Sequence, residues 1–199
     1  MEVIMKAVDR LVVKLIKDGA IEEEDREIYE YGFTQGIVML INFICTLLIG
    51  FCMGMVKEVL VFMLAYIPLR SFSGGFHAKT QARCFVYSNL LVVGILAISR
   101  YLTEVPLVYL ILGLIGAIII IILAPVEDKN KPLDENEVKV YGRKAKIILF
   151  ADVMIAIALQ LFELFSLVST IMVSAFALGI FLIMGYVKNL RLEKSGCEE

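Results

Sequence analysis

The stretch VPLVYLILGLIGAIIIIILAPV, residues 105–126, contains no charged residue and decides the fold class. A helix needs about 20 mostly apolar residues to cross the hydrocarbon core of a bilayer, and this stretch is long enough. Two further charge-free runs, 31–56 and 164–187, are long enough as well. Hydrophobic residues make up 60% of the 199-residue chain, more than in typical soluble domains. The sequence therefore predicts an all-α integral membrane protein.

Three further segments are shorter or contain charged residues: 57–69, 84–99 and 146–163. If all six segments cross and the N-terminus lies inside, most basic residues fall on the cytoplasmic side, and only Lys57 and Arg100 fall outside. This asymmetry agrees with the positive-inside rule. We therefore expect a polytopic helical bundle of six transmembrane segments with both termini cytoplasmic. A re-entrant 57–69 segment, with Pro68 near its end, is the open alternative.

The polar parts of the chain lie at its start and in its middle. Within residues 1–30, the first turns alternate apolar and basic residues at helical spacing, which is typical of an amphipathic helix lying in the membrane interface. Packing of this helix on the protein's own soluble face is the alternative. Residues 127–145 are expected to form a cytoplasmic loop. The length of the chain fits a single membrane domain, 1–199.

The sequence RSFSGGFHAKTQARC, residues 70–84, combines a loop at 70–83 with Cys84 at the start of an apolar segment. Cations and helix N-termini favour the thiolate form of a cysteine, and Arg83 adjoins Cys84. His77 is the single histidine of the chain, and a base beside a nucleophile is the minimal unit of covalent acyl transfer. The residues alone also fit a basic juxtamembrane loop that contains a cysteine by chance.

Geometry limits how His77 and Cys84 can meet. Seven residues along a straight helix would place them about 10 Å apart, too far for a hydrogen bond. We therefore expect a break in the chain, for which Gly74 and Gly75 supply the flexibility. Cys84 would then begin the next helix. Asp152 is a candidate for the acid that orients the histidine, and a structural partner for a basic residue is its alternative role.

The string RSFSGGFHA at 70–78, with Cys84 seven residues past the histidine, resembles the accessory gene regulator protein B (AgrB) family. The string APVEDKNKPL at 124–133 is similar to the second signature of that family, a proline that leaves a span and is followed by a polar loop. The positions of this second signature are Pro125, Asn130, Lys131 and Pro132. The likeness covers nearly the whole chain.

The resemblance implies a membrane cysteine endopeptidase of quorum sensing in the bacterial cell membrane. The cysteine that matches Cys84 would cleave a small AgrD-like precursor peptide with the help of His77. An acyl-thioester would form and close to a thiolactone autoinducer. Arg70, Gly74 and Gly75 would be motif residues around the site. A basic loop with Lys79 and Arg83 would attract an acidic leaving segment.

Other functions and partners follow from other features. A carrier or channel for a small peptide is the alternative function, because Asp152, Gln160 and Glu163 can share one helix face. One histidine and scattered cysteines fit no metal site, and no cofactor is expected. No nucleic-acid partner is expected, and the small net charge argues neither for nor against one. Gly50 and Gly54 favour a homodimer, and packing within one chain is the alternative.

Overall fold

The computed structural model describes residues 2–75, 81–127 and 133–196, and its elements are all helices. They are α1 (Glu2–Lys17), the 3-10 turn η1 (Glu23–Asp25), α2 (Arg26–Cys52), α3 (Val56–Ser73), α4 (Gln81–Leu102), α5 (Pro106–Leu123), α6 (Glu135–Leu161) and α7 (Phe165–Gly196). The prediction of an all-α membrane protein is confirmed. By length and composition, α2, α4, α5 and α7 can each cross a bilayer. The count of six crossings stays a prediction, because α3 and α6 do not meet this criterion.

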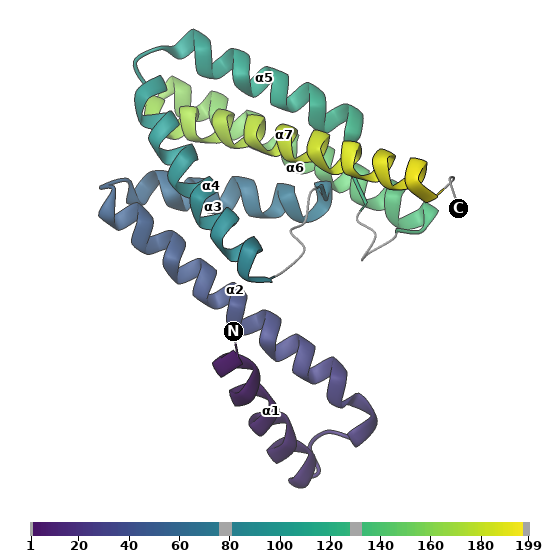
Figure 1. The fold of residues 1–199 in the computed structure, drawn as a ribbon. Coiled ribbons are helices and arrows are strands. Elements are labelled where there is room, and N and C mark those ends of the chain that lie inside the picture. The colour runs from purple at the N-terminus through teal and green to yellow at the C-terminus, as the bar shows by residue number, and fades with distance from the viewer. Residues whose placement is uncertain (1, 76–80, 128–132, 197–199) are drawn as a thin grey trace.

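Helix α7 is the centre of the bundle. Its most apolar part is 61% buried, compared with 22% for that of α5, and α3, α4, α5 and α6 all pack against it. Figure 1 shows α5 lying along α7, while α1 and the first half of α2 extend away from the bundle. The apolar residues on the outside of the bundle are therefore those expected to meet lipid.

Small residues allow α5 and α7 to approach closely. A Cβ at Gly116 would lie 2.5 Å from backbone atoms of Ala175 and Phe176, and Gly179 of α7 lies beside Gly116. In lipid, helices associate through such close packing, since burial of apolar surface gives little advantage there. The glycines of α5 thus serve contacts within the chain.

In the structure, the two glycines whose spacing favoured a homodimer, Gly50 and Gly54, lie at a helix contact within the chain and in a turn. A Cβ at Gly50 would lie 2.7 Å from Val59 of the same chain, so the absence of a side chain at Gly50 allows α3 to pack closely against α2. Gly54 lies in the turn after α2 with a φ of 67° and has no heavy atom near its missing Cβ. Neither glycine therefore supports association between chains, and the homodimer stays a prediction.

Several helices extend beyond the predicted segments. Helix α6 begins at Glu135, so part of the segment expected to be a cytoplasmic loop, 127–145, is helical. The reason is a capping box: Oδ1 of Asp134 accepts from the Glu137 amide at 3.1 Å, and Oε2 of Glu137 accepts from the Asp134 amide at 3.2 Å. Helix α3 continues through Pro68 to Ser73.

Helix α1 packs on α2 along one edge. Val8 and Val12 are buried there, and Asp9 binds Arg26 at the start of α2 at 2.8 Å. The apolar side chains of Met5 and Leu11 stay exposed on the remaining surface. The helix therefore packs on its own chain and still presents apolar residues outward. Its position in a membrane interface stays a prediction.

Several polar side chains inside the bundle are paired between helices. Asn89 of α4 donates to Asn42 of α2 at 3.2 Å, and Ser166 of α7 donates to Glu58 of α3 at 2.6 Å. Ser169 donates to the carbonyl of Ser99 at 3.0 Å. Such pairs satisfy groups that an apolar surrounding would leave without a partner.

Gly116→Ala is expected to lower the stability of the bundle, because the new Cβ would press against the backbone of α7. Overpacking of this kind costs about 1–3 kcal/mol. Gly94→Ala on α4 is the matched control, because nothing lies within 4 Å of its Cβ position. That control should leave stability unchanged or raise it by up to about 1 kcal/mol. Thermal unfolding in detergent, followed by far-UV circular dichroism, compares the two, and equal melting temperatures would contradict the prediction.

Candidate active site

The two signature segments meet at one end of the bundle, where α3 and α5 end. The amide of Gly75 donates to the carbonyl of Val126 at 3.0 Å, and the amide of Val126 donates to the carbonyl of Ser73 at 2.9 Å. Gly74 and Val126 form an isolated parallel β-bridge, the one strand-like pairing in the described residues. Both segments stand out in the sequence but their contact does not, because no local pattern reports pairing between segments far apart in the chain.

Gly74 must be glycine for two reasons. Its φ of 68° and ψ of −145° lie in a region that only glycine adopts easily. A Cβ there would also collide with the carbonyl oxygen of Val126. The flexibility predicted for this pair is thus realised as a specific backbone conformation that presses against the second signature segment.

Gly75 makes room for the side chain of Arg70. Its φ is 110°, and a Cβ would lie 2.8 Å from Nη1 of Arg70 and 3.2 Å from the carbonyl oxygen of Phe181. The guanidinium therefore lies against the backbone of the loop and beside α7. This position explains physically why an arginine precedes the glycine pair by one turn of helix.

Cys84 lies in the first turn of α4, and its side chain is exposed as a free cysteine. The prediction that Cys84 opens a helix is therefore confirmed. Tyr66, one turn before Arg70 on α3, is 8% exposed and lies in the neighbourhood of both Arg70 and Cys84. Tyr66 was not among the predicted site residues, although its i, i+4 spacing from Arg70 places both on one face of α3.

Several predicted site residues lie outside the described residues: His77, Lys79, Asn130, Lys131 and Pro132. The proximity of His77 to Cys84 therefore stays a prediction. The described chain ends at Gly75 before the histidine and resumes at Gln81 after it. Arg83 is exposed beside Cys84.

Asp152 lies on the buried face of α6, and its Oδ2 has no hydrogen-bond partner among the described residues. It is ten residues beyond Gly142, which contacts Pro125, so it lies about 15 Å further along the helix axis. Its pairing with His77 stays a prediction.

The polar residues considered for a carrier have different surroundings. Gln160 accepts a hydrogen bond from the hydroxyl of Tyr109 at 3.2 Å. Glu163 is exposed in the turn between α6 and α7, with a φ of 60°. Only Asp152 of the three is buried. Gln160 and Glu163 therefore do not continue a buried polar path from Asp152.

Contacts of the Phe72 ring hold α3 against α6 close to the glycine pair. The rings of Phe72 and Tyr141 pack edge to face with centroids 5.7 Å apart, and the ammonium of Lys144 lies 4.9 Å from the centre of the Phe72 ring. The described residues contain no cluster of histidine, cysteine or carboxylate side chains able to hold a metal ion.

These features define a helical membrane protein with a candidate thiol site at one end of the bundle. A family model described as accessory gene regulator B matches residues 8–186. The chain belongs to this accessory gene regulator B family.

Relatives in two genera carry the same family name. An AgrB-like protein of Clostridium perfringens strain SM101 is 28% identical over 165 residues, which cover 77% of each chain. The accessory gene regulator protein B of Staphylococcus saprophyticus is 33% identical over 100 residues, 50% of this chain and 52% of its own. That of Staphylococcus intermedius is 30% identical over 129 residues, 63% and 59%. No solved structure matches the chain.

Gly74→Ala is expected to destabilise the site more than Gly54→Ala. Both glycines have nearly the same positive φ, 68° and 67°, but only Gly74 has Val126 against its Cβ position. The positive φ costs Gly54→Ala about 1–2 kcal/mol, whereas the backbone strain at Gly74, whose ψ is −145°, costs about 1–3 kcal/mol and the collision adds about 1–3 kcal/mol more. Melting temperatures in detergent measure the difference. Equal losses would mean that the contact with Val126 does not hold the loop.

Proposed function

We propose that this chain is a membrane cysteine endopeptidase that cleaves an AgrD-like precursor peptide and closes it to a thiolactone. One structural observation supports this proposal most. The two signature segments are hydrogen-bonded to each other beside Arg70, and the thiol of Cys84 is free and exposed on the first turn of α4. An accessible thiol on the first turn of a helix is suited to covalent acyl transfer.

In the first step, Sγ of Cys84 attacks a carbonyl carbon of the precursor. The peptide C–N bond breaks, and the proton of the thiol passes through His77 to the leaving amine. The C-terminal part of the precursor leaves as a free peptide. The N-terminal part stays on Cys84 as a thioester.

In the second step, a thiol within the bound peptide attacks the thioester carbonyl. A new C–S bond closes the ring, the bond to Cys84 breaks, and the proton of the attacking thiol returns to Cys84. Water would compete for the same carbonyl. A site at the membrane boundary limits that water and holds a membrane-associated precursor close by.

The remaining site residues have supporting roles in this proposal. Arg70, Lys79 and Arg83 would attract an acidic leaving segment. Asp152 would orient His77. The loop with Pro125, Asn130, Lys131 and Pro132 would frame the substrate opposite the glycine pair. The site would face the cytoplasm of a bacterial cell, with both termini of the multi-pass chain on that side, and no cofactor takes part.

Cys84→Ala is expected to abolish cleavage of a co-expressed precursor, because removal of a covalent nucleophile costs more than about 10³-fold in rate. Wild type should carry a thiol-sensitive peptide adduct, seen by mass spectrometry and on non-reducing gels. Cys52→Ala is the matched control, since Cys52 is also exposed and free, and it should cleave normally.

The same experiment separates the peptidase from a peptide carrier. A carrier would tolerate Cys84→Ser, whereas the peptidase would lose the thioester and the ring closure. His77→Ala should also stop cleavage while Cys84 stays available to alkylating reagents. Continued cleavage by Cys84→Ala would overturn the proposal and favour the carrier.

A further inference from the structure

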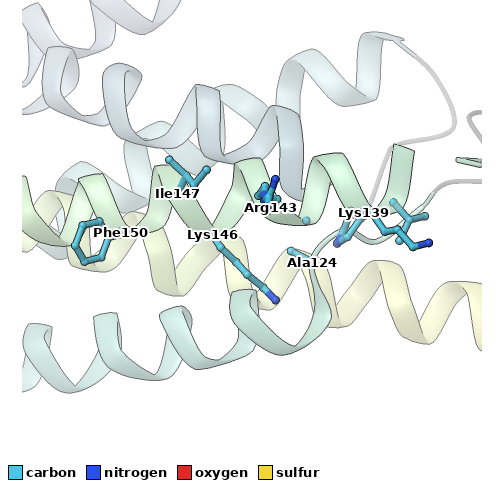
Figure 2. A pocket seen from close by; sticks show the side chains of 9 residues that line it. Ala124, Lys139, Arg143, Lys146, Ile147 and Phe150 are labelled. Atoms are coloured by element: carbon cyan, nitrogen blue, oxygen red, sulfur yellow. The ribbon is translucent and has the colours of Figure 1, made fainter. Parts of the chain in front are cut away.

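An open groove of about 600 Å³ lies on the side of the bundle where the turn after α5 meets α6 (Figure 2). It is lined by Ala124, Pro125, Val138, Lys139, Gly142, Arg143, Lys146, Ile147 and Phe150. The substrate chemistry proposed above uses none of its basic residues. We call this the α6 groove.

One end of the α6 groove is strongly basic. Lys139, Arg143 and Lys146 recur at helical spacing on one face of α6, and Figure 2 shows them along one stretch of the helix. All three are exposed, and none forms an ion pair within the part of the chain that the structure describes. Of the acids at the start of α6, Asp134 and Glu137 are engaged in the N-terminal cap, and Glu135, one turn before Lys139, is exposed and forms no ion pair among the described residues.

The other end of the α6 groove is apolar and open. Ile147 is 60% exposed and Phe150 is 68% exposed. The basic residues extend over about 10 Å of the helix axis, and Phe150 lies about 6 Å beyond Lys146. If the membrane boundary falls at residue 146, as predicted from the sequence, the charges would lie at the headgroup level and Phe150 in the hydrocarbon. The groove itself changes from cationic to apolar along α6.

We infer that the α6 groove binds one anionic phospholipid, with its phosphate at Lys139, Arg143 and Lys146 and an acyl chain along Ile147 and Phe150. A phospholipid has its negative charge at one end and its apolar part at the other, in the order that the groove presents. An acidic peptide segment would leave Ile147 and Phe150 uncovered. Basic pockets at the cytoplasmic side of helical bundles take anionic headgroups for the same reason.

Such a lipid would touch the scaffold of the candidate active site. Gly142 faces Pro125, and a Cβ at Gly142 would lie 3.2 Å from the proline ring. Pro125 precedes Val126, which is hydrogen-bonded to Gly75. A bound lipid would therefore brace the turn that holds the glycine pair. The binding itself does not depend on the peptidase proposal.

The chain contains no tryptophan, so a single introduced one reports on its own surroundings. Phe150→Trp is reconstituted in phosphatidylcholine vesicles that contain a fixed fraction of lipid brominated in the acyl chain. Brominated phosphatidylglycerol should quench the fluorescence at least about twofold more than brominated phosphatidylcholine, because an occupied site raises the local concentration of its ligand.

Ile118→Trp is the control for depth. Ile118 is 48% exposed on α5 and lies seven residues before Pro125, while Phe150 lies eight residues beyond Gly142. Both positions are therefore about 10–12 Å from the contact between Gly142 and Pro125. The two brominated lipids should quench the tryptophan at 118 equally.

Charge variants in the Phe150→Trp background test the basic residues. Lys139→Gln with Arg143→Gln and Lys146→Gln should remove the preference for phosphatidylglycerol. The control is Lys6→Gln with Lys14→Gln and Lys17→Gln on α1. It removes the same amount of charge elsewhere and should keep the preference for phosphatidylglycerol. Peptide cleavage is not the readout, so this test is separate from that of the proposed function.

Three results would overturn the inference. Equal quenching of the Phe150→Trp protein by both lipids would mean that the α6 groove does not select an anionic headgroup. A preference that survives the triple glutamine substitution would be a general surface-charge effect. Release of the quenching by a soluble oligoglutamate peptide, without an equal effect on the control at 118, would assign the groove to an acidic peptide.

Discussion

The backbone pairing between the glycine pair and Val126 is the contact on which the candidate site depends. It joins the end of α3 to the turn after α5 through two hydrogen bonds, from the amides of Gly75 and Val126. Backbone groups at the end of a membrane bundle need partners, and here each segment supplies them to the other. The Arg70 guanidinium lies against this junction, so the arginine is positioned by backbone as well as by its own helix.

Close helix packing makes the junction possible. Helix α7 lies at the centre of the bundle, and α5 approaches it at Gly116 without side chains between them. Helices in lipid gain little from burying apolar surface, so contact area and paired polar groups stabilise their association. The end of α5 is placed by this contact, and the turn that begins at Ala124 starts from there. Because Gly142 has no side chain, α6 can pack closely against Pro125.

The candidate site has two polar neighbourhoods around the ends of α3 and α5. On one side, the Arg70 guanidinium lies against Gly75. On the other, the α6 groove carries three cations above an apolar surface. Pro125 borders the groove directly, and through Val126 it reaches the glycine pair. A lipid in the groove would thus touch the short turn that is paired with the glycine pair.

The sequence by itself determined the helical membrane class, the role of the glycine pair as a break, and the position of Cys84 at the start of a helix. These features depend on local composition and spacing, which hydropathy and backbone preference report directly. Only the tertiary structure decided that the two signature segments pair and that Gly75 makes room for the side chain of Arg70. It also decided that Gly50 and Gly116 serve contacts within one chain. Contacts between residues far apart in the chain depend on how helices pack, and no periodic pattern encodes which helices become neighbours.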